Sequence, residues 1–298
     1  QRQMCIRDRV YKGYINGLND PYSVYYNKKE TKELYESTGG EYSGIGAVMS
    51  QNTETGVITL VQIYKDSPAE KAGLKANDIL YKVEGKEVTG KDLSKVVSKV
   101  KGEKGTTVEL TVLRGEDAKE VTVTATRDTV QAQTIEYKMM DDKIGYIRVS
   151  EFDTVTYDQY KEALDDLEKQ GMTGLVVDLR NNPGGSLSTV CDMLDLMLPK
   201  GLIVYTEDKN GKKTEMKSDE EHQFTKPLAV LVNGNSASAS EIFSGAMQDS
   251  GKAKLVGTTT FGKGIVQSVI PLSDGTAVKL TVAKYFTPNG NDIHKKGI

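Results

Sequence analysis

The chain has 298 residues, which favours about two domains at roughly 150 residues each. Hydrophobic residues make up 37% and charged residues 27%, so the sequence is too apolar for a disordered tail. Lys and Arg number 39 against 42 for Asp and Glu, and this net charge of −3 argues against nucleic acid as a partner. No apolar stretch approaches the roughly 18 residues that a membrane helix needs. We therefore expect no membrane span in these residues.

Cysteine and histidine are scarce. The two cysteines, Cys5 and Cys191, are too few for a disulfide framework or a structural zinc site. The two histidines are His222 and His294, which removes most chemistry that depends on histidine. We expect neither a metal nor a cofactor.

The N-terminal part of the chain falls into two segments. Residues 1–9, QRQMCIRDR, are Arg-rich, have no clear period and contain no signal-peptide apolar stretch. We interpret them as foreign or misjoined sequence. Residues 10–40 form a helical segment, with apolar positions at helical spacing over Val10–Leu18 and a second helix over Lys29–Glu36.

Residues 41–127 change to a strand period and predict a small β-rich domain. Short apolar runs separated by turn residues predict its strands, and one helix is predicted over Lys91–Lys99. The strands are predicted over Gly44–Met49, Gly56–Tyr64 and Asp78–Val83, with a half-exposed hairpin of Val108–Leu113 and Glu120–Thr126.

Residues 128–298 alternate strands with helices, which predicts an α/β layer with a largely parallel sheet. Functional groups should then gather at the carboxyl ends of its strands. The predicted strands are Ile144–Val149, Leu175–Leu179 and Leu228–Val232. The predicted helices are Tyr157–Gln170, Leu187–Leu198 and Ser238–Gln248.

Two junctions between a strand and a helix carry candidate chemistry. In the first, Leu179–Gly185, consecutive glycines allow a sharp turn and leave backbone N–H groups free to meet an anion. An ordinary glycine turn is the alternative. The second junction, Val232–Glu241, alternates serines with small residues, and a serine at a helix N-terminus gains the positive end of the helix dipole. Its alternative is a simple helix cap in which Glu241 completes a capping box with Ser238.

A nucleophilic serine needs a base, and the histidines are poorly placed for this role. His222 lies in a charged loop and His294 near the end of the chain. A lysine can act as the base where a dry environment lowers its pKa. Lys263, which has a glycine on either side and lies between apolar segments, is the candidate. A solvated turn lysine is the alternative.

The segment 257–264, GTTTFGKG, offers a different interpretation. It matches the first seven positions of a phosphate-binding P-loop, but Gly264 stands where the magnesium-binding Ser or Thr belongs. The residues that follow, Ile265–Ile270, are strand-like, so the helix that such a loop requires is missing. We disfavour nucleotide binding.

With these segments in place, the chain resembles the carboxyl-terminal processing peptidases, or tail-specific proteases, of peptidase family S41. The resemblance runs from about Val10 to the end of the chain and rests on six motifs in the same order. The motifs are Leu18–Ser23, Gly44–Gly46, Asp66–Leu74, Leu179–Gly185, Asn235–Glu241 and Phe261–Gln267. It implies a Ser/Lys protease core of the α/β crotonase-like (ClpP/crotonase) type over 128–298 and a PDZ domain over 41–127.

The resemblance also implies roles for individual residues, so that the two junctions would meet at one site. These are the nucleophile Ser238, the general base Lys263, the lysine-orienting Gln267, the oxyanion-hole N–H groups of Gly184 and Ala239, and a supporting Glu241. A neutral lysine would take the serine proton, and two fixed N–H donors would hold the tetrahedral oxyanion.

A PDZ domain binds a peptide as an added strand and captures its terminal carboxylate with backbone N–H groups. In this chain those donors would come from the loop of Gly44, Ile45, Gly46 and Ala47. In the family the module recruits protein C-termini and gates the protease site.

The implied function is a serine endopeptidase that recognises protein C-termini and acts on proteins or peptides with an accessible C-terminus. The alternative is a non-catalytic PDZ scaffold with a degenerate or incomplete protease core. The resemblance further implies an extracytoplasmic location, in the cell envelope or periplasm, with an N-terminal anchor outside these residues. We expect the protease core to continue beyond Ile298, and a homodimer is left open.

Overall fold

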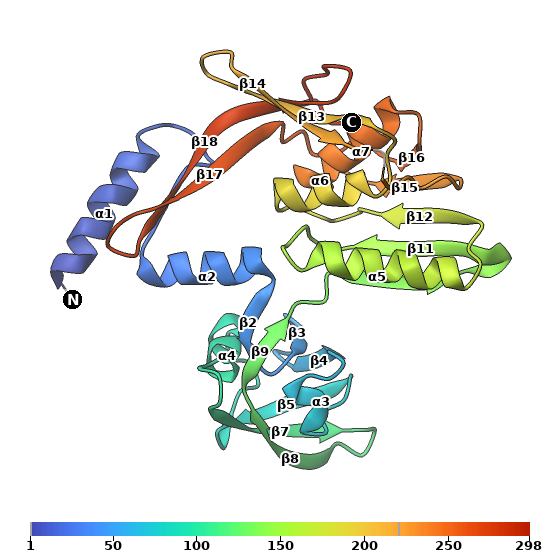
Figure 1. Ribbon diagram of the computed structural model, residues 1–298. Helices are drawn as coiled ribbons and strands as arrows, with labels where there is room; N and C mark the ends of the chain where they lie inside the picture. The colour runs from blue at the N-terminus through green and yellow to red at the C-terminus, as the bar shows by residue number, and fades with distance from the viewer. Residues whose placement is uncertain (1, 220) are drawn as a thin grey trace. The chain divides into compact units, whose positions relative to one another are not determined.

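A computed structural model describes residues 2–219 and 221–298, with side chains from Ile6 onward. It divides into a small unit, Glu41–Gln133, and a large unit made of the N-terminal residues up to Gly40 together with Thr134–Ile298 (Figure 1). Within the described residues, no helix has the length and apolar character of a membrane span.

The N-terminal segment of the large unit contains α1 (Arg2–Asn16), β1 (Val24–Tyr26) and α2 (Lys28–Gly39). Helix α2 contains the predicted helix Lys29–Glu36, whereas α1 starts earlier than the predicted Val10–Leu18 and ends two residues sooner, at Asn16 before Gly17. Asn27 caps α2 in a reciprocal pair of hydrogen bonds with Glu30. The helix ends at Gly40, whose φ of 68° is the left-handed conformation that suits glycine.

The small unit is an antiparallel sheet with two short helices. Its sheet has the order β3-β4-β5-β7-β8, with β6 paired to β5, while β2 and β9 pair with each other. The strands are β2 (Glu41–Gly44), β3 (Ala47–Gln51), β4 (Ile58–Ile63), β5 (Asp78–Val83), β6 (Lys86–Glu87), β7 (Thr107–Arg114), β8 (Lys119–Thr126) and β9 (Asp128–Gln131). The helices are α3 (Pro68–Lys71) and α4 (Leu93–Val100).

The predicted hairpin is confirmed as the antiparallel pair β7 and β8. The single strand predicted over Gly44–Met49 is wrong, because β2 ends at Gly44 and β3 begins at Ala47. Gly46 breaks it with a φ of 77°, and a Cβ there would lie 2.5 Å from the Ser67 Cβ. The chain therefore turns where the apolar pattern continues.

The central sheet of the large unit has the order β10-β11-β12-β15-β16. Its last four strands are parallel and β10 is antiparallel, which confirms the prediction of a largely parallel sheet. The strands are β10 (Ile135–Met139), β11 (Ile144–Val149), β12 (Gly174–Asp178), β15 (Leu228–Val232) and β16 (Lys254–Gly257). The helices of this part are η1 (Asp141–Lys143), α5 (Thr156–Lys169), α6 (Leu187–Asp195) and α7 (Ala239–Asp249).

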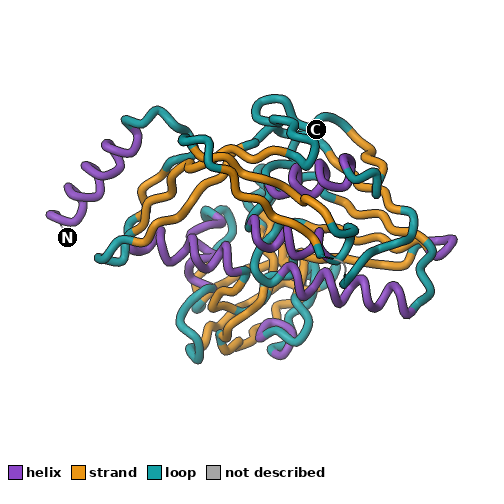
Figure 2. The backbone as a smooth tube through the Cα atoms, turned by 45° about the horizontal axis from the view of Figure 1, so that its top comes forward, coloured by secondary structure: helices purple, strands orange, loops and turns teal. Residues whose placement is uncertain are grey.

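A second sheet of the large unit has the order β1-β18-β13-β14, with β17 paired to β18. It consists of β1 with β13 (Gly201–Asp208), β14 (Lys213–Ser218), β17 (Ile265–Pro271) and β18 (Ala277–Phe286). Figure 2 shows β17 and β18 as a long hairpin among the orange strands. Helix α7 contacts β16 of the central sheet and β13 of the second sheet, and every residue from Ala239 to Met247 is buried.

The parallel strands bring three loops to the same edge of the central sheet. The loop after β12 carries the glycine pair, the loop after β15 carries the serines, and the loop after β16 carries Lys263. The predicted gathering of functional segments at the carboxyl ends of the strands is therefore present.

Candidate active site

Ser238 directly precedes α7, in the loop that follows β15. Its backbone has φ 55° and ψ −112°, a combination that residues other than glycine rarely adopt. Such a conformation costs about 1–3 kcal/mol, so its surroundings must hold it. The Ser238 N–H donates to Glu241 Oε2 at 2.9 Å, and its carbonyl accepts from the Tyr285 hydroxyl at 3.0 Å. Ser238 therefore occupies the helix cap and also lines the cavity described below.

The Glu241 carboxylate is fully buried and accepts four hydrogen bonds. Oε2 accepts the N–H of Ser238 at 2.9 Å and that of Lys263 at 2.8 Å. Oε1 accepts the Thr260 hydroxyl at 2.7 Å and the Gly262 N–H at 2.6 Å. These donors replace the water that a buried carboxylate loses. Glu241 thus joins the serine loop to the lysine loop.

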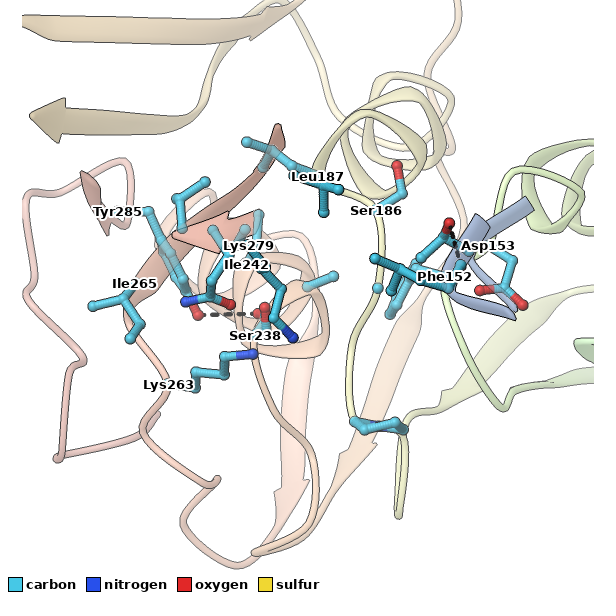
Figure 3. A pocket seen from close by; sticks show the side chains of 18 residues that line it. Phe152, Asp153, Ser186, Leu187, Ser238, Ile242, Lys263, Ile265, Lys279 and Tyr285 are labelled. Atoms are coloured by element: carbon cyan, nitrogen blue, oxygen red, sulfur yellow. Dashed lines mark hydrogen bonds between the residues drawn. The ribbon is translucent and has the colours of Figure 1, made fainter. Parts of the chain in front are cut away.

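Lys263 is half-buried and lines the same cavity as Ser238. Burial lowers the pKa of Lys263, and the positive charge of Lys279 lowers it further, while the Glu241 charge acts in the opposite direction. The Lys263 Nζ lies 5.2 Å from the centre of the Tyr22 ring. Figure 3 shows its nitrogen directed toward Ser238. This environment favours a neutral amine more than a solvated turn would.

Gln267 on β17 also lines the cavity. The pairing of β17 with β18 shifts register between Val266 and Gln267, and such bulges redirect side chains near functional sites. The Gln267 Nε2 is buried and has no hydrogen-bond partner within the described residues. It is therefore a polar group in the cavity wall that is available to a neighbour or a ligand.

Gly184 brings the turn after β12 directly against the serine loop. Its φ is 105°, and a Cβ there would lie 2.8 Å from the Ser238 Cβ and 2.9 Å from the Ala239 nitrogen. Only glycine fits this contact without strain. The two junctions meet as the resemblance implied. The Gly184 N–H, however, already donates to Asn182 Oδ1 at 2.8 Å.

Asn182 is a site residue that sequence reasoning missed. It is fully buried, and its Nδ2 donates to the Val149 carbonyl at 2.9 Å. Its own carbonyl accepts the Ala237 N–H and the Ser240 hydroxyl, both at 3.0 Å. Asn182 therefore ties the end of β11, the glycine turn and the serine loop together. The Asn-Pro-Gly order was a usable signal, because Asn favours a turn in which its side chain accepts a backbone N–H two residues later.

Ala239 and Gly185 also line the cavity. Ala239 is the first residue of α7, where N–H groups have no partner within the helix. Gly185 forms a parallel bridge with Phe152 through the neighbouring Gly184 carbonyl and Ser186 N–H. Within the described chain, the backbone N–H groups of Ala239 and Gly185 donate to no acceptor outside helices and strands. Both remain available as donors.

The cavity has a volume of about 310 Å³ and combines apolar walls with a few charged groups (Figure 3). Its apolar walls include Leu187, Ile242 and Ile265. At its far side lies Asp153, which sequence reasoning did not single out. Burial raises the pKa of Asp153 to about 7, and the nearby Glu151 adds to the effect.

The P-loop interpretation of residues 257–264 finds no support in the structure. Strand β16 ends at Gly257 and strand β17 begins at Ile265, so a strand follows the loop where a phosphate site needs a helix. The N–H groups of Gly262 and Lys263 donate to Glu241. They are not free to bind a phosphate.

The small unit has a groove of its own, with a volume of about 140 Å³. It lies between the edge strand β3 and α4, and is lined by Ile45, Gly46, Ala47, Met49, Val97, Val100, Lys101 and Tyr42. The carbonyls of Ile45 and Gly46 accept N–H groups of the unit itself. Gly44 lies beside the groove, because a Cβ there would lie 2.9 Å from the Tyr42 ring. An open edge strand beside an apolar groove suits the addition of a peptide strand.

Comparison with known proteins decides the family. The model of peptidase family S41 matches residues 143–298, more than half of the chain. The chain belongs to peptidase family S41. A PDZ-domain model matches residues 59–114 of this S41 chain, within the small unit.

Carboxy-terminal processing protease CtpA of Bacillus subtilis is 42% identical over 292 residues, covering 98% of this chain and 62% of its own length. CtpB of the same organism is 40% identical over 300 residues, covering 98% of this chain and 62% of its own length. The solved structure of a photosystem II D1 C-terminal processing protease aligns with a TM-score of 0.58 and 31% identity, covering 96% of this chain and 78% of that one. The chain thus spans about three-fifths of the length of these Bacillus relatives.

Proposed function

We propose that this S41 chain is a serine endopeptidase that recognises protein C-termini through its PDZ domain and cleaves by acyl transfer at Ser238. The observation that carries the proposal is the shared carboxylate of Glu241, which fixes Ser238 and Lys263 at one cavity. The names of the relatives, carboxy-terminal processing proteases, support the same reaction class.

In this mechanism the neutral Lys263 amine takes the proton of the Ser238 hydroxyl as its Oγ attacks the carbonyl carbon of the scissile bond. The tetrahedral intermediate collapses, the C–N bond breaks, and the lysine ammonium gives its proton to the leaving amine. Water then attacks the acyl ester, with Lys263 again taking the proton and returning it to Ser238. The lowered pKa of Lys263 supports this role, because the base must be neutral at the start.

The oxyanion would be held by the N–H groups of Ala239 and Gly184. The contact of Gly184 with Ser238 and Ala239 supports this placement. The Ala239 donor is ready, whereas the Gly184 N–H must first leave Asn182 Oδ1. We therefore propose that substrate binding is accompanied by a rotation of the peptide between Pro183 and Gly184.

Gln267 would orient the Lys263 amine. Both residues line the same cavity, and the side-chain amide of Gln267 has a buried nitrogen without a partner in the described chain.

The PDZ domain would place a substrate C-terminus along β3, with its carboxylate at the loop of Gly44, Ile45, Gly46 and Ala47. The open edge of β3 and the apolar groove support this assignment.

Two finer assignments belong to the same proposal. The parallel strands β11, β12, β15 and β16 with helices α5, α6 and α7 support a crotonase-like core. We also keep the extracytoplasmic location as a prediction, to be tested by fractionating cells and probing for the protein outside the cytoplasm.

The experiment that tests the function is cleavage of a protein substrate with an exposed apolar C-terminal tail. Ser238→Ala and Lys263→Ala should each abolish cleavage while leaving the thermal unfolding transition in place. Lys254→Ala, an exposed lysine on β16, is the matched control and should retain activity. Full activity in either site variant excludes the Ser/Lys mechanism.

The alternative function, a PDZ scaffold that binds peptides without cleaving them, is favoured by one observation. The Gly184 N–H is already paired with Asn182, so the oxyanion hole is one donor short in this arrangement. Peptide binding by the wild-type protein without turnover, at any substrate concentration, would support the scaffold.

A further inference from the structure

The carbonyl group of Ser238 has an unusual set of partners. It accepts the N–H groups of Glu241 at 2.8 Å and Ile242 at 3.0 Å, as the first carbonyl of a helix does. It also accepts the hydroxyl of Tyr285 at 3.0 Å, drawn as a dashed line in Figure 3. Tyr285 comes from β18, far from Ser238 in the sequence.

This third hydrogen bond bears on the neighbouring residue. A peptide unit is planar and trans, so its carbonyl and its N–H point in opposite directions across one rigid plane. Fixing the Ser238 carbonyl therefore fixes the direction of the Ala239 N–H. Under the proposed function, that N–H is the oxyanion donor that is ready in this structure.

Tyr285 is well suited to hold the Ser238–Ala239 peptide in a fixed orientation. Its side chain is 1% exposed and lines the catalytic cavity, and its own N–H donates to the Gly264 carbonyl at 3.1 Å. Its strand pairs with β13 opposite Thr206 and with β17 on the other side. Burial, with a further contribution from the Glu241 charge, raises the pKa of Tyr285 above its usual range, so the phenol remains a donor.

The need for such a support follows from the backbone of Ser238. Its positive φ is unfavourable for a serine, so the peptide that follows it would relax if it were not held. Glu241 holds the N–H side of Ser238, and Tyr285 holds its carbonyl side.

We propose that Tyr285 is a positioning residue that orients the Ser238–Ala239 peptide and so sets the Ala239 N–H of the oxyanion hole. This inference rests on the proposed function and adds a residue whose hydroxyl acts through the Ser238–Ala239 peptide. It assigns to Tyr285 an effect on the transition state and not on substrate binding.

The test compares Tyr285→Phe with wild type in the purified protein. Because removal of a direct oxyanion donor costs about 10²–10³ in kcat, loss of its support should lower kcat by roughly 10-fold with KM changed less than about 2-fold. Affinity for a peptide aldehyde, which forms a tetrahedral adduct with the serine, should fall by a similar factor. Affinity for the cleaved product peptide should stay unchanged.

Tyr160→Phe is the matched control, because Tyr160 is also fully buried in the large unit but its hydroxyl contacts the Met197 sulfur at 3.4 Å. It should leave kcat and aldehyde affinity unchanged. The proposal is overturned if Tyr285→Phe loses affinity for the aldehyde and for the product peptide by the same factor. It is also overturned if a folded Tyr285→Phe protein keeps both the wild-type kcat and the wild-type aldehyde affinity. Failure of the proposed function looks different, since wild type and Ser238→Ala would then show the same cleavage rate.

Discussion

Ser238 and Lys263 donate their backbone N–H groups to the same oxygen atom, Oε2 of Glu241, at 2.9 and 2.8 Å. The two residues come from different loops, after β15 and after β16, and the buried carboxylate makes them one structural group. The relative position of the serine and the lysine loops therefore depends on the geometry of a third side chain.

The first prediction concerns that carboxylate. Glu241→Gln keeps the size of the side chain but replaces one oxygen by an NH₂ group, which repels two of the four donors. Leaving buried donors without acceptors costs about 1–3 kcal/mol each, so for two donors the free energy of unfolding should fall by roughly 2–6 kcal/mol. We expect kcat/KM to fall at least about 10-fold as the serine and lysine loops separate.

Denaturant unfolding and steady-state kinetics of Glu241→Gln measure both effects. Glu33→Gln on the exposed face of α2 is the control and should change neither. A Glu241→Gln protein with wild-type kinetics would show that the shared oxygen does not set the active geometry.

The second prediction concerns pH. Burial lowers the pKa of Lys263, and the Lys279 charge lowers it further. Catalysis requires neutral Lys263, so kcat/KM rises as pH increases through that pKa. Lys279→Met removes the charge and raises the pKa of Lys263. The acidic limb of the kcat/KM profile should therefore move to higher pH, with activity lost first on the acidic side.

Lys284→Met is the control for this shift. Lys284 lies on the same strand but pairs with Asp292 at 3.5 Å and does not line the cavity. Its pH profile should match wild type. An acidic limb that stays in place, or moves to lower pH, in Lys279→Met contradicts the assignment of Lys263 as the base.

The third prediction concerns the Gly184 N–H, which donates to Asn182 Oδ1. A carboxylate accepts a stronger hydrogen bond than an amide oxygen, so Asn182→Asp should hold the Gly184 N–H more firmly and also repel the oxyanion. We expect kcat to fall at least about 10-fold, measured by single-turnover acylation. Asn181→Asp is the control, since its side chain bonds Asn233 and Asn235 at the surface. An unchanged acylation rate in Asn182→Asp would show that Gly184 does not supply the second oxyanion donor. The Gly185 N–H would then be the next candidate.

The sequence was sufficient for the parts of the site that depend on local pattern. Three features can be recognised from short stretches of sequence: the small residues around Ser238, the glycines on both sides of Lys263 and the apolar strand before each loop. The parallel order of the central sheet follows from the same alternation of strands and helices.

What the sequence did not yield depends on contacts between distant residues. Tyr285 reaches Ser238 across 47 positions, and nothing near Tyr285 indicates an interaction with a serine loop. The second sheet was missed for a related reason, because β14 carries mostly exposed polar residues and β18 pairs with β1 from the N-terminal segment. Only the folded chain shows that β18 of this sheet, together with β17, lines the cavity.

The last prediction concerns recognition by the PDZ domain. Lys101 follows α4 at the edge of the groove, and its Nζ lies 4.5 Å from the centre of the Tyr42 ring. A cation held beside the loop of residues 44–47 should add a charge-assisted contact to a terminal carboxylate. Lys101→Met should therefore weaken binding of a peptide with a free C-terminus by roughly 3- to 10-fold, about 0.7–1.4 kcal/mol.

Fluorescence anisotropy in a Ser238→Ala background measures this binding without cleavage. An amidated version of the same peptide should bind weakly, and Lys101→Met should not weaken it further, because the carboxylate is gone. Lys99→Met, an exposed lysine in the last turn of α4, should leave both affinities as they are. If Lys101→Met weakens the amidated and the free peptide by the same factor, the lysine contributes through the apolar part of its side chain. The carboxylate would then be held by the loop alone.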